Sequence, residues 1–323
     1  MATTTNIAEI LRRRNQRSFL ERLSGGDEIA YSITLFTAVL ILAFVGLIVL
    51  ELWTHSQPTV KAFGFHFLTA SEWDPNAGKF GALPFIYGTC VTSLLALAIA
   101  VPLGVSASIF LAEMAPPKLS SFLTFLIELL AAVPSVIYGL IGIFILVPAI
   151  RDYVVPPLTA AFGFLPIFKG DFYGLSFFSA GVVLSIMVVP FIISVSREVL
   201  LAVPTEQREA ALALGATKWE TTWQIVLPTA STGIIGSVFL ALARALGETM
   251  AVTMVVGNTP KITASLLSPG YSIAAVIANE FAEASGDLYV SSLIFLGLVL
   301  FGLTIVINAV ARILIFITMR RRA

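Results

Sequence analysis

Charged residues are scarce in this sequence of 323 residues. They make up 12% of the chain, against about a quarter in ordinary soluble domains. In contrast, 58% of the residues are hydrophobic and the mean hydropathy is +0.95. A single water-soluble domain is therefore excluded. Several membrane-spanning helices are predicted, because each span needs roughly 20 apolar residues.

The chain also lacks an excess of charge of one sign, and it is poor in cysteine and histidine. Its 19 lysines and arginines balance its 19 acidic residues, so the totals give no reason to expect nucleic acid as a partner. Cys90 is the single cysteine, and His55 and His66 are the two histidines. One cysteine cannot form an intramolecular disulfide, and two histidines cannot complete a metal shell. We expect no metal and no cofactor.

Long uncharged runs predict an all-α integral membrane protein with six spans. The first run is longer than the core of a signal peptide, about 7 to 15 residues, so we expect an uncleaved helix. The predicted spans are 29–50, 80–112, 119–150 (interrupted by Glu128), 172–196, about 229–258 (interrupted by Arg244 and Glu248) and 288–311.

Lysine and arginine cluster on one side of this topology, in an N-terminal arm, the short turn 113–118, the loop 197–228 and the C-terminal tail. The positive-inside rule therefore predicts that both termini are cytoplasmic. Three long connections, 53–82, 148–174 and 259–287, then lie outside. The predicted organisation is a cytoplasmic arm over 1–28, a six-helix membrane domain over 29–317 and a basic cytoplasmic tail over 318–323.

The internal loop 197–228 contains the signals of two short helices. Thr205 is predicted to cap the first helix, and Gly215 to end it. Thr217 and Glu220 match the capping box S/T-x-x-E, which begins a second helix that Pro228 is expected to close.

Such short helices are not stable alone in water, so another body must pack on them. Trp219 and Trp223, four residues apart, are expected to share one face of the second helix. One interpretation is a helix pair that lies on the inner leaflet, and the other is a docking surface for a protein.

The spacing of Glu209, Ala210, Ala211 and Gly215, followed by Ile225-x-Leu227-Pro228, resembles the EAA loop of ATP-binding-cassette importer permeases. The resemblance implies a type I ABC importer permease fold. In that family the loop sits in a cleft of a cytoplasmic ATPase and carries its closing motion into the membrane. The docking residues would here be Glu209, Ala210, Ala211 and Gly215.

The nucleotide-binding motif G-x-x-x-x-G-K-[ST] is absent from this sequence, whose one Gly-Lys pair is Gly78-Lys79. The chain is therefore not expected to be an enzyme, and ATP hydrolysis is expected on separate subunits. The membrane-enzyme motifs H-E-x-x-H and G-x-S-x-G are absent as well.

Arg244 and Glu248 are four residues apart, which predicts that they lie on one face of the fifth helix. Counted from residue 229, Arg244 would lie near the middle of the bilayer, where an arginine costs about +2.5 to +3.5 kcal/mol. We therefore expect the pair to face the interior of the bundle. It is either an ion pair that locks helices together or a contact for a travelling anion, because guanidinium binds phosphate-like oxygens in a bidentate manner. Glu128 is the other intramembrane charge, and a structural role is at least as well supported for it.

Several stretches resemble the PstC-type permease of the phosphate-specific importer. They are FLT at 67–69 with WDP at 73–75, the run 84–104, ELLAAVPSVIYGL at 128–140, ARALGETMAVTM at 243–254 and SIAAVIANEFAEA at 272–284. The resemblance covers roughly residues 60–315, and it implies that Arg244 and Glu248 are critical for transport.

The same resemblance implies a complex in the cytoplasmic membrane of a prokaryote, within the lipid bilayer. The expected partners are a second related permease (PstA-like), a homodimeric cytoplasmic ATPase (PstB-like) and an extracytoplasmic phosphate-binding protein (PstS-like). Two alternatives stay open. One is a permease for another oxyanion, sulfate or molybdate, and the other is an ion-coupled secondary carrier in which Arg244, Glu248 and Glu128 form a relay.

Overall fold

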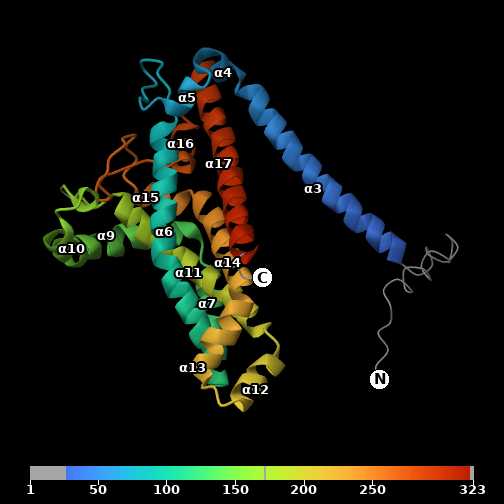
Figure 1. Ribbon diagram of the computed structural model, residues 1–323. Coiled ribbons are helices and arrows are strands. Elements are labelled where there is room, and N and C mark those ends of the chain that lie inside the picture. The colour runs from blue at the N-terminus through green and yellow to red at the C-terminus, as the bar shows by residue number, and fades with distance from the viewer. Residues whose placement is uncertain (1–26, 171, 321–323) are drawn as a thin grey trace. The chain divides into compact units, whose positions relative to one another are not determined.

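A computed structural model of the chain describes residues 27–170 and 172–320. The described residues form helices and connecting loops, with an isolated antiparallel bridge between Asp74 and Lys79 (Figure 1). The predicted arm 1–28 lies outside the described residues except for its last two positions. The last three residues of the predicted tail 318–323 also lie outside them.

The chain divides into two compact units, Met1–Thr54 and His55–Ala323. The described residues of the first unit, 27–54, belong to the helix α3 (Asp27–His55). Its large hydrophobic side chains are exposed on all sides, and none of its most apolar stretch is buried. A helix that is apolar all round requires lipid or another apolar helix around it.

The second unit is built around two helices, α6 (Leu83–Ile109) and α11 (Phe177–Leu201), which pack along each other. Glycines allow the close approach. A Cβ atom at Gly104 would lie 2.7 Å from Cγ2 of Ile192, and one at Gly181 would lie 2.5 Å from Cδ2 of Leu95. Larger residues at these positions would push the two helices apart.

The remaining helices of the second unit follow one another through short loops or directly. In chain order they are α4 (Gln57–Phe63), α5 (His66–Thr69), η1 (Phe110–Met114), α7 (Pro117–Ala131), α8 (Ser135–Ile141), η2 (Gly142–Leu146), α9 (Val147–Ala149), η3 (Ile150–Val154), α10 (Val155–Phe162), η4 (Pro166–Phe168), α12 (Thr205–Ala213), α13 (Lys218–Thr221), η5 (Thr222–Val226), α14 (Leu227–Leu246), α15 (Met250–Val255), α16 (Ile273–Glu280) and α17 (Asp287–Arg320).

Six helices within the described residues are long and apolar enough to cross a membrane, which confirms the predicted number. The first, second, fourth and sixth lie close to the predicted ranges. The six are Ile29–His55, Leu83–Met114, Ser135–Phe162, Phe177–Leu201, Lys218–Leu246 and Asp287–Val310.

The prediction was wrong for the third span, which is Ser135–Phe162 and not 119–150. Helix α7 ends at Ala131, and Pro134, which has no N–H and whose ring obstructs the preceding turn, separates it from α8. The helix then continues past Arg151 and Asp152 into a segment predicted as an external connection. Arg151 Nε and Asp152 Oδ1 are 2.8 Å apart, so two charges that suggested a boundary neutralise each other inside the helix.

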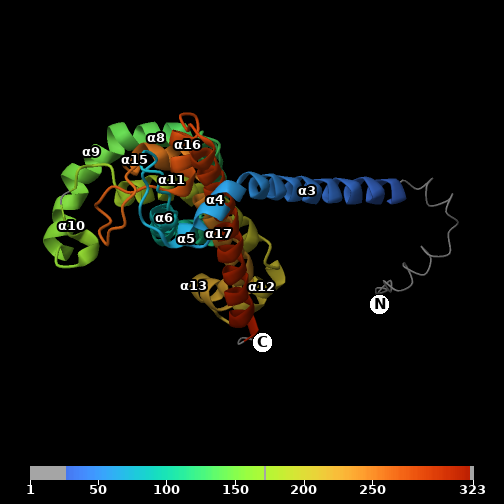
Figure 2. The same ribbon diagram turned by 90° about the horizontal axis from the view of Figure 1, so that it is seen from above.

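The run from α8 to α10 is curved (Figure 2). Its α-helical pieces are joined by two π-helical turns, η2 and η3. Wide turns of this kind bend a helix without ending it.

The fifth span was also predicted at the wrong position: it is Lys218–Leu246 and not 229–258. Helix α13 does not stop at Pro228 but continues through the π-helical turn η5 into α14. Pro228 is the second residue of α14, which follows η5 directly. A wider turn can accommodate a residue without an N–H donor, so the helix continues past the proline and is not closed by it.

Helices α4, α5 and α16 lie at one end of the second unit (Figure 1). Aromatic side chains from this region pack there with others from α6 and α17. Glu280 accepts hydrogen bonds there from Trp73 Nε1 at 2.9 Å and from the Tyr289 hydroxyl at 2.7 Å. This carboxylate ties together two of the predicted external connections, 53–82 and 259–287. Helices α12 and α13 lie at the opposite end of this unit.

Candidate functional site

Helix α12 begins the loop that resembles the EAA motif. The prediction that Thr205 caps it was wrong, because α12 starts at Thr205 itself and Pro204 stands in the cap position without a side-chain hydrogen bond. An extended proline directly before a helix begins it by its fixed backbone, without an oxygen acceptor. Glu206 lies in the first turn, where negative charge is favourable.

Gly215 ends this helix as predicted. It has φ +89°, a left-handed conformation that glycine adopts without strain. Ala216 N–H donates to Ala211 O at 3.1 Å, and Gly215 N–H donates to Leu212 O at 3.0 Å. These two bonds form a Schellman motif, which turns the chain sharply toward α13.

The predicted capping box at the start of α13 is confirmed. Glu220 N–H donates to Thr217 Oγ1 at 3.2 Å, and Thr217 N–H donates to Glu220 Oε2 at 2.7 Å. Trp219 and Trp223 share a face, as predicted, with ring centroids 5.4 Å apart and an interplanar angle of 61°. Both tryptophans are about half exposed.

A groove of about 620 Å³ lies between α12 and the helix that follows it. Four of its lining residues belong to the EAA-like pattern: Ala210, Ala211, Ile225 and Pro228. The two alanines come from the start of the pattern and the other two residues from its end. Glu209 and Gly215 are exposed on the same short segment. The fold therefore brings two separated parts of the pattern to one groove, which we call the loop groove, while Glu209 and Gly215 are exposed but do not line it.

Arg208 is a residue of this loop that sequence reasoning missed. Its guanidinium donates to Glu113 Oε1 at 2.9 Å and to Leu200 O at 2.7 Å, and it also donates to Val203 O. Glu113 precedes it by 95 positions, so no local pattern connects the two residues.

Arg244 lies in the last turn of α14, and the predicted continuous helix through Glu248 was wrong. The helix ends at Leu246, and α15 begins at Met250. Arg244 therefore lies near one end of its candidate span, not midway along it. Among the residues that the structure describes, no ion pair joins Arg244 to Glu248. The end at Leu246 lies directly before Gly247, and the spacing of the two charges did not reveal it.

The two side chains of this region have different surroundings. Arg244 is exposed on this chain, so the expectation that it faces the interior of the chain's own bundle was wrong. Glu248 is half-buried, and its carboxylate accepts a hydrogen bond from Ala251 N–H at 3.3 Å, in the first turn of α15. A carboxylate at this position offsets the unpaired N–H groups of the helix start.

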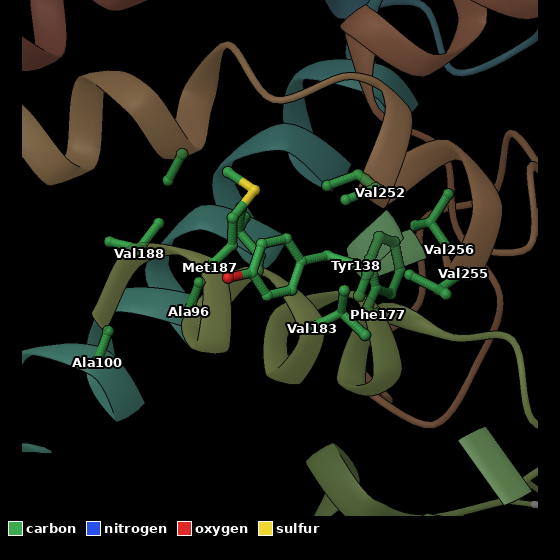
Figure 3. Packing of buried hydrophobic residues seen from close by; sticks show 14 of the residues in the cluster. Ala96, Ala100, Tyr138, Phe177, Val183, Met187, Val188, Val252, Val255 and Val256 are labelled. Carbon is green, nitrogen blue, oxygen red and sulfur yellow. The ribbon is translucent and has the colours of Figure 1, made fainter. Parts of the chain in front are cut away.

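A second broken helix lies beside the first. Helices α8 and α15 pack so closely that a Cβ atom at Gly139 would lie 2.5 Å from Sδ of Met254. Tyr138 joins the core cluster with Met187 and Val252 (Figure 3). Its hydroxyl donates to Leu130 O at 2.7 Å across the break between α7 and α8.

Glu128, near the end of α7, is exposed. Within residues 27–170 and 172–320 its carboxylate forms no hydrogen bond or ion pair. The structure does not bring it together with Arg244 and Glu248 in a network of bonds.

Comparisons with known proteins agree on one family. The family "Binding-protein-dependent transport system inner membrane component" matches residues 104–317. The phosphate transport system permease protein PstC of Mesorhizobium japonicum is 44% identical over 304 residues, which is 93% of each chain. The protein of the same name in Xylella fastidiosa is 47% identical over 287 residues, 88% of each chain.

A solved bacterial ABC transporter involved in the import of the acidic polysaccharide alginate has the same fold. It is 18% identical, with a TM-score of 0.53, and the match covers 91% of this chain and 99% of that one. The predicted type I importer permease architecture is confirmed by this likeness and by the family match. The chain therefore belongs to the PstC family of phosphate transport system permeases, within the inner membrane components of binding-protein-dependent transport systems.

Proposed function

We propose that this chain is a membrane-spanning permease subunit of an ATP-driven phosphate importer in the cytoplasmic membrane of a prokaryote. It forms the translocation path together with a second, PstA-like permease. Membership in the PstC family carries this proposal, because the chain aligns with those permeases over nearly its whole length. The relatives are named as phosphate transport permeases.

The loop groove is the proposed contact with a homodimeric, PstB-like ATPase. The proposed docking residues are Ala210 and Ala211, which line the groove, together with Glu209 and Gly215, which are exposed on the same segment. Small alanines let a second protein approach the backbone of α12 closely, and Gly215 holds the turn between the two short helices. ATP hydrolysis belongs to that separate subunit, since this sequence contains no Walker A motif.

Arg244 is the proposed contact for the anion in transit, with Glu248 beside it. An exposed arginine on an apolar helix cannot remain in lipid at low cost. Burial of this face against the second permease would place Arg244 along the path between the two subunits. A guanidinium with uncommitted donors can bind two oxygens of a tetrahedral anion and release them again.

Delivery from outside is assigned to a PstS-like phosphate-binding protein. Docking of a cytoplasmic ATPase at the loop groove requires this loop, and with it both termini, to be cytoplasmic. Cysteines placed at 61 and 170 in a Cys90→Ser background should react with an impermeant maleimide in intact cells. Cysteines at 118 and 218 should react only after the cells are opened. The reverse pattern would invert the proposed topology.

Uptake in proteoliposomes containing the complete complex tests the function itself. ATP-dependent accumulation of radiolabelled phosphate is expected to resist competition by sulfate and molybdate; efficient competition by either would favour the alternative oxyanion importer. Glu209→Lys should lower uptake at least tenfold while ATP hydrolysis continues. The matched control, Glu198→Lys, changes an exposed carboxylate outside α12 and α13 and should leave uptake within twofold.

A further inference from the structure

The contact between Arg208 and Glu113 is unusually well buried for an ion pair. The two side chains are 17% and 11% exposed, and the charged atoms are 2.9 Å apart. The pairs Lys79–Glu72, Arg151–Asp152 and Arg197–Glu198 each contain at least one partner that is more than half exposed. Exposed pairs hold little in place, whereas a buried pair constrains the elements that carry it.

Arg208 also completes the end of another helix. Leu200 and Val203, whose carbonyl oxygens accept its other hydrogen bonds, lie at the end of α11 and directly after it. The last carbonyls of a helix have no partner within the helix, and a cation is favourable beside them. One guanidinium therefore connects α12, the end of α11 and the turn η1 that contains Glu113.

These three elements meet at the base of the helix pair on which the second unit is built. Turn η1 is the direct continuation of α6, and α6 packs along α11. Ser120 Oγ donates to Leu111 O at 2.8 Å, which also fixes the start of α7 against η1. Leu200, Val203 and Val226 form a buried hydrophobic cluster at this junction.

We propose that Arg208 and Glu113 form the joint through which α12 moves the inner ends of α6 and α11. Arg208 is a positioning residue: it acts through α12 and touches no substrate. The inference rests on the proposed function, because it takes α12 to be the element that the ATPase moves. Arginine suits this place because its rigid fork reaches a carboxylate and two carbonyls at once, which an ammonium group cannot do with fixed geometry.

The coupling ratio, ATP hydrolysed per phosphate taken up, tests the joint in proteoliposomes with the complete complex. Arg208→Gln and Glu113→Gln should each raise this ratio at least tenfold, with the ATPase subunits still bound after purification. Arg208→Lys keeps the charge and should recover part of the coupling. The matched control is Glu198→Gln, which removes a carboxylate that also lies 2.9 Å from an arginine but is 71% exposed; its ratio should stay within twofold.

A spin label at Ala213→Cys in a Cys90→Ser background reports the position of α12 without reference to transport. In the full chain in nanodiscs, without and then with the ATPase, the label should become more mobile in Arg208→Gln and Glu113→Gln and stay unchanged in Glu198→Gln. Equal mobility in all variants would overturn the joint, whatever happens to uptake. Increased mobility with a normal coupling ratio would overturn its role in transmission.

The two proposals can fail separately. Normal coupling in Glu209→Lys together with loss of coupling in Glu113→Gln would contradict docking at the loop groove and leave the joint standing. Loss of coupling in Glu209→Lys together with unchanged label mobility and a normal ratio in both joint variants would do the opposite.

Discussion

Two arginines of this chain are held in opposite ways. Arg208 is mostly buried and donates to one carboxylate and two backbone carbonyls. Arg244 is exposed, and among the described residues it has no ion-pair partner. A satisfied guanidinium contributes to the position of the helices around it. A guanidinium with open donors on an apolar helix is available to a partner subunit or a ligand.

The difference is not visible in the spacing of charges. Arg244 has an acidic residue four positions away and does not pair with it, whereas Arg208 pairs with a carboxylate 95 positions away. The positions of helix ends determine whether each arginine pairs with an acidic residue. The end of α14 at Leu246 separates Arg244 from Glu248, and the ends of α6 and α11 bring a carboxylate and carbonyls to Arg208.

The largest expected effect is a loss of phosphate uptake, without a loss of stability, on substitution of Arg244. Arg244→Gln should lower phosphate uptake at least a hundredfold, while thermal unfolding of the purified chain by itself, in which Arg244 is exposed, stays unchanged, because an exposed substitution costs about 0.5 kcal/mol or less. Arg244→Lys should retain part of the uptake. The control is Arg312→Gln, another exposed arginine of a long helix, with nearly normal uptake. Normal flux in Arg244→Gln would remove this residue from the anion pathway.

Substitution of Arg208, unlike that of Arg244, is expected to lower local stability, which hydrogen exchange measures. Hydrogen bonds to charged groups contribute about 1.5–3 kcal/mol, so Arg208→Gln should speed exchange of the α12 amides by about 10- to 100-fold. Mass spectrometry of peptides from 204–216 measures this directly. Arg244→Gln should leave the same peptides unchanged, and equal protection in both variants would abolish the contrast between the two arginines.

Double-mutant cycles compare the coupling free energy of Arg208 and Glu113 with that of Arg244 and Glu248. Truncation of Arg208 and Glu113, singly and together, should give a coupling energy of about 1–3 kcal/mol in thermal unfolding, because the groups are in contact. The cycle for Arg244 and Glu248 should give less than about 0.5 kcal/mol. A large coupling in the second cycle would restore the ion pair that the break in the helix argues against.

The smallest effect concerns the turn that positions Arg208 and the loop groove. Gly215→Ala should destabilise α12 by about 1–2 kcal/mol, because alanine is strained at φ +89° although the space around the residue is open. Gly302→Ala, in α17, also adds a methyl group in open space but in ordinary helical backbone. It should be neutral or slightly stabilising, and an equal loss in both variants would show that volume, not backbone conformation, matters.

Local rules predicted much of the loop 197–228. The capping box at Thr217 and Glu220, the helix end at Gly215 and the tryptophan pair were all read correctly, because each depends on residues within a few positions of one another. Thr205 and Pro228 were misread. Proline before a helix can take the place of a capping side chain, and a π-helical turn can carry a helix past a proline.

Charge-free runs predicted six spans, but not where the third and fifth lie. Arg151 and Asp152 neutralise each other inside a helix, and so the rule that charges mark ends failed there. The breaks at Pro134 and Gly247 divide apolar runs that composition alone treats as continuous.

Hydrophobicity by itself determined that six helices of the described residues are long and apolar enough to cross a membrane, and the spacing of one loop determined the likeness to importer permeases. Both are properties of contiguous sequence. Tertiary structure alone decided that the Arg208 guanidinium has a carboxylate and two carbonyls as partners, whereas Arg244 is exposed. Partners for a guanidinium depend on where helices end and which ends meet, and these positions follow from the packing of α6, α7, α11 and α14 against one another.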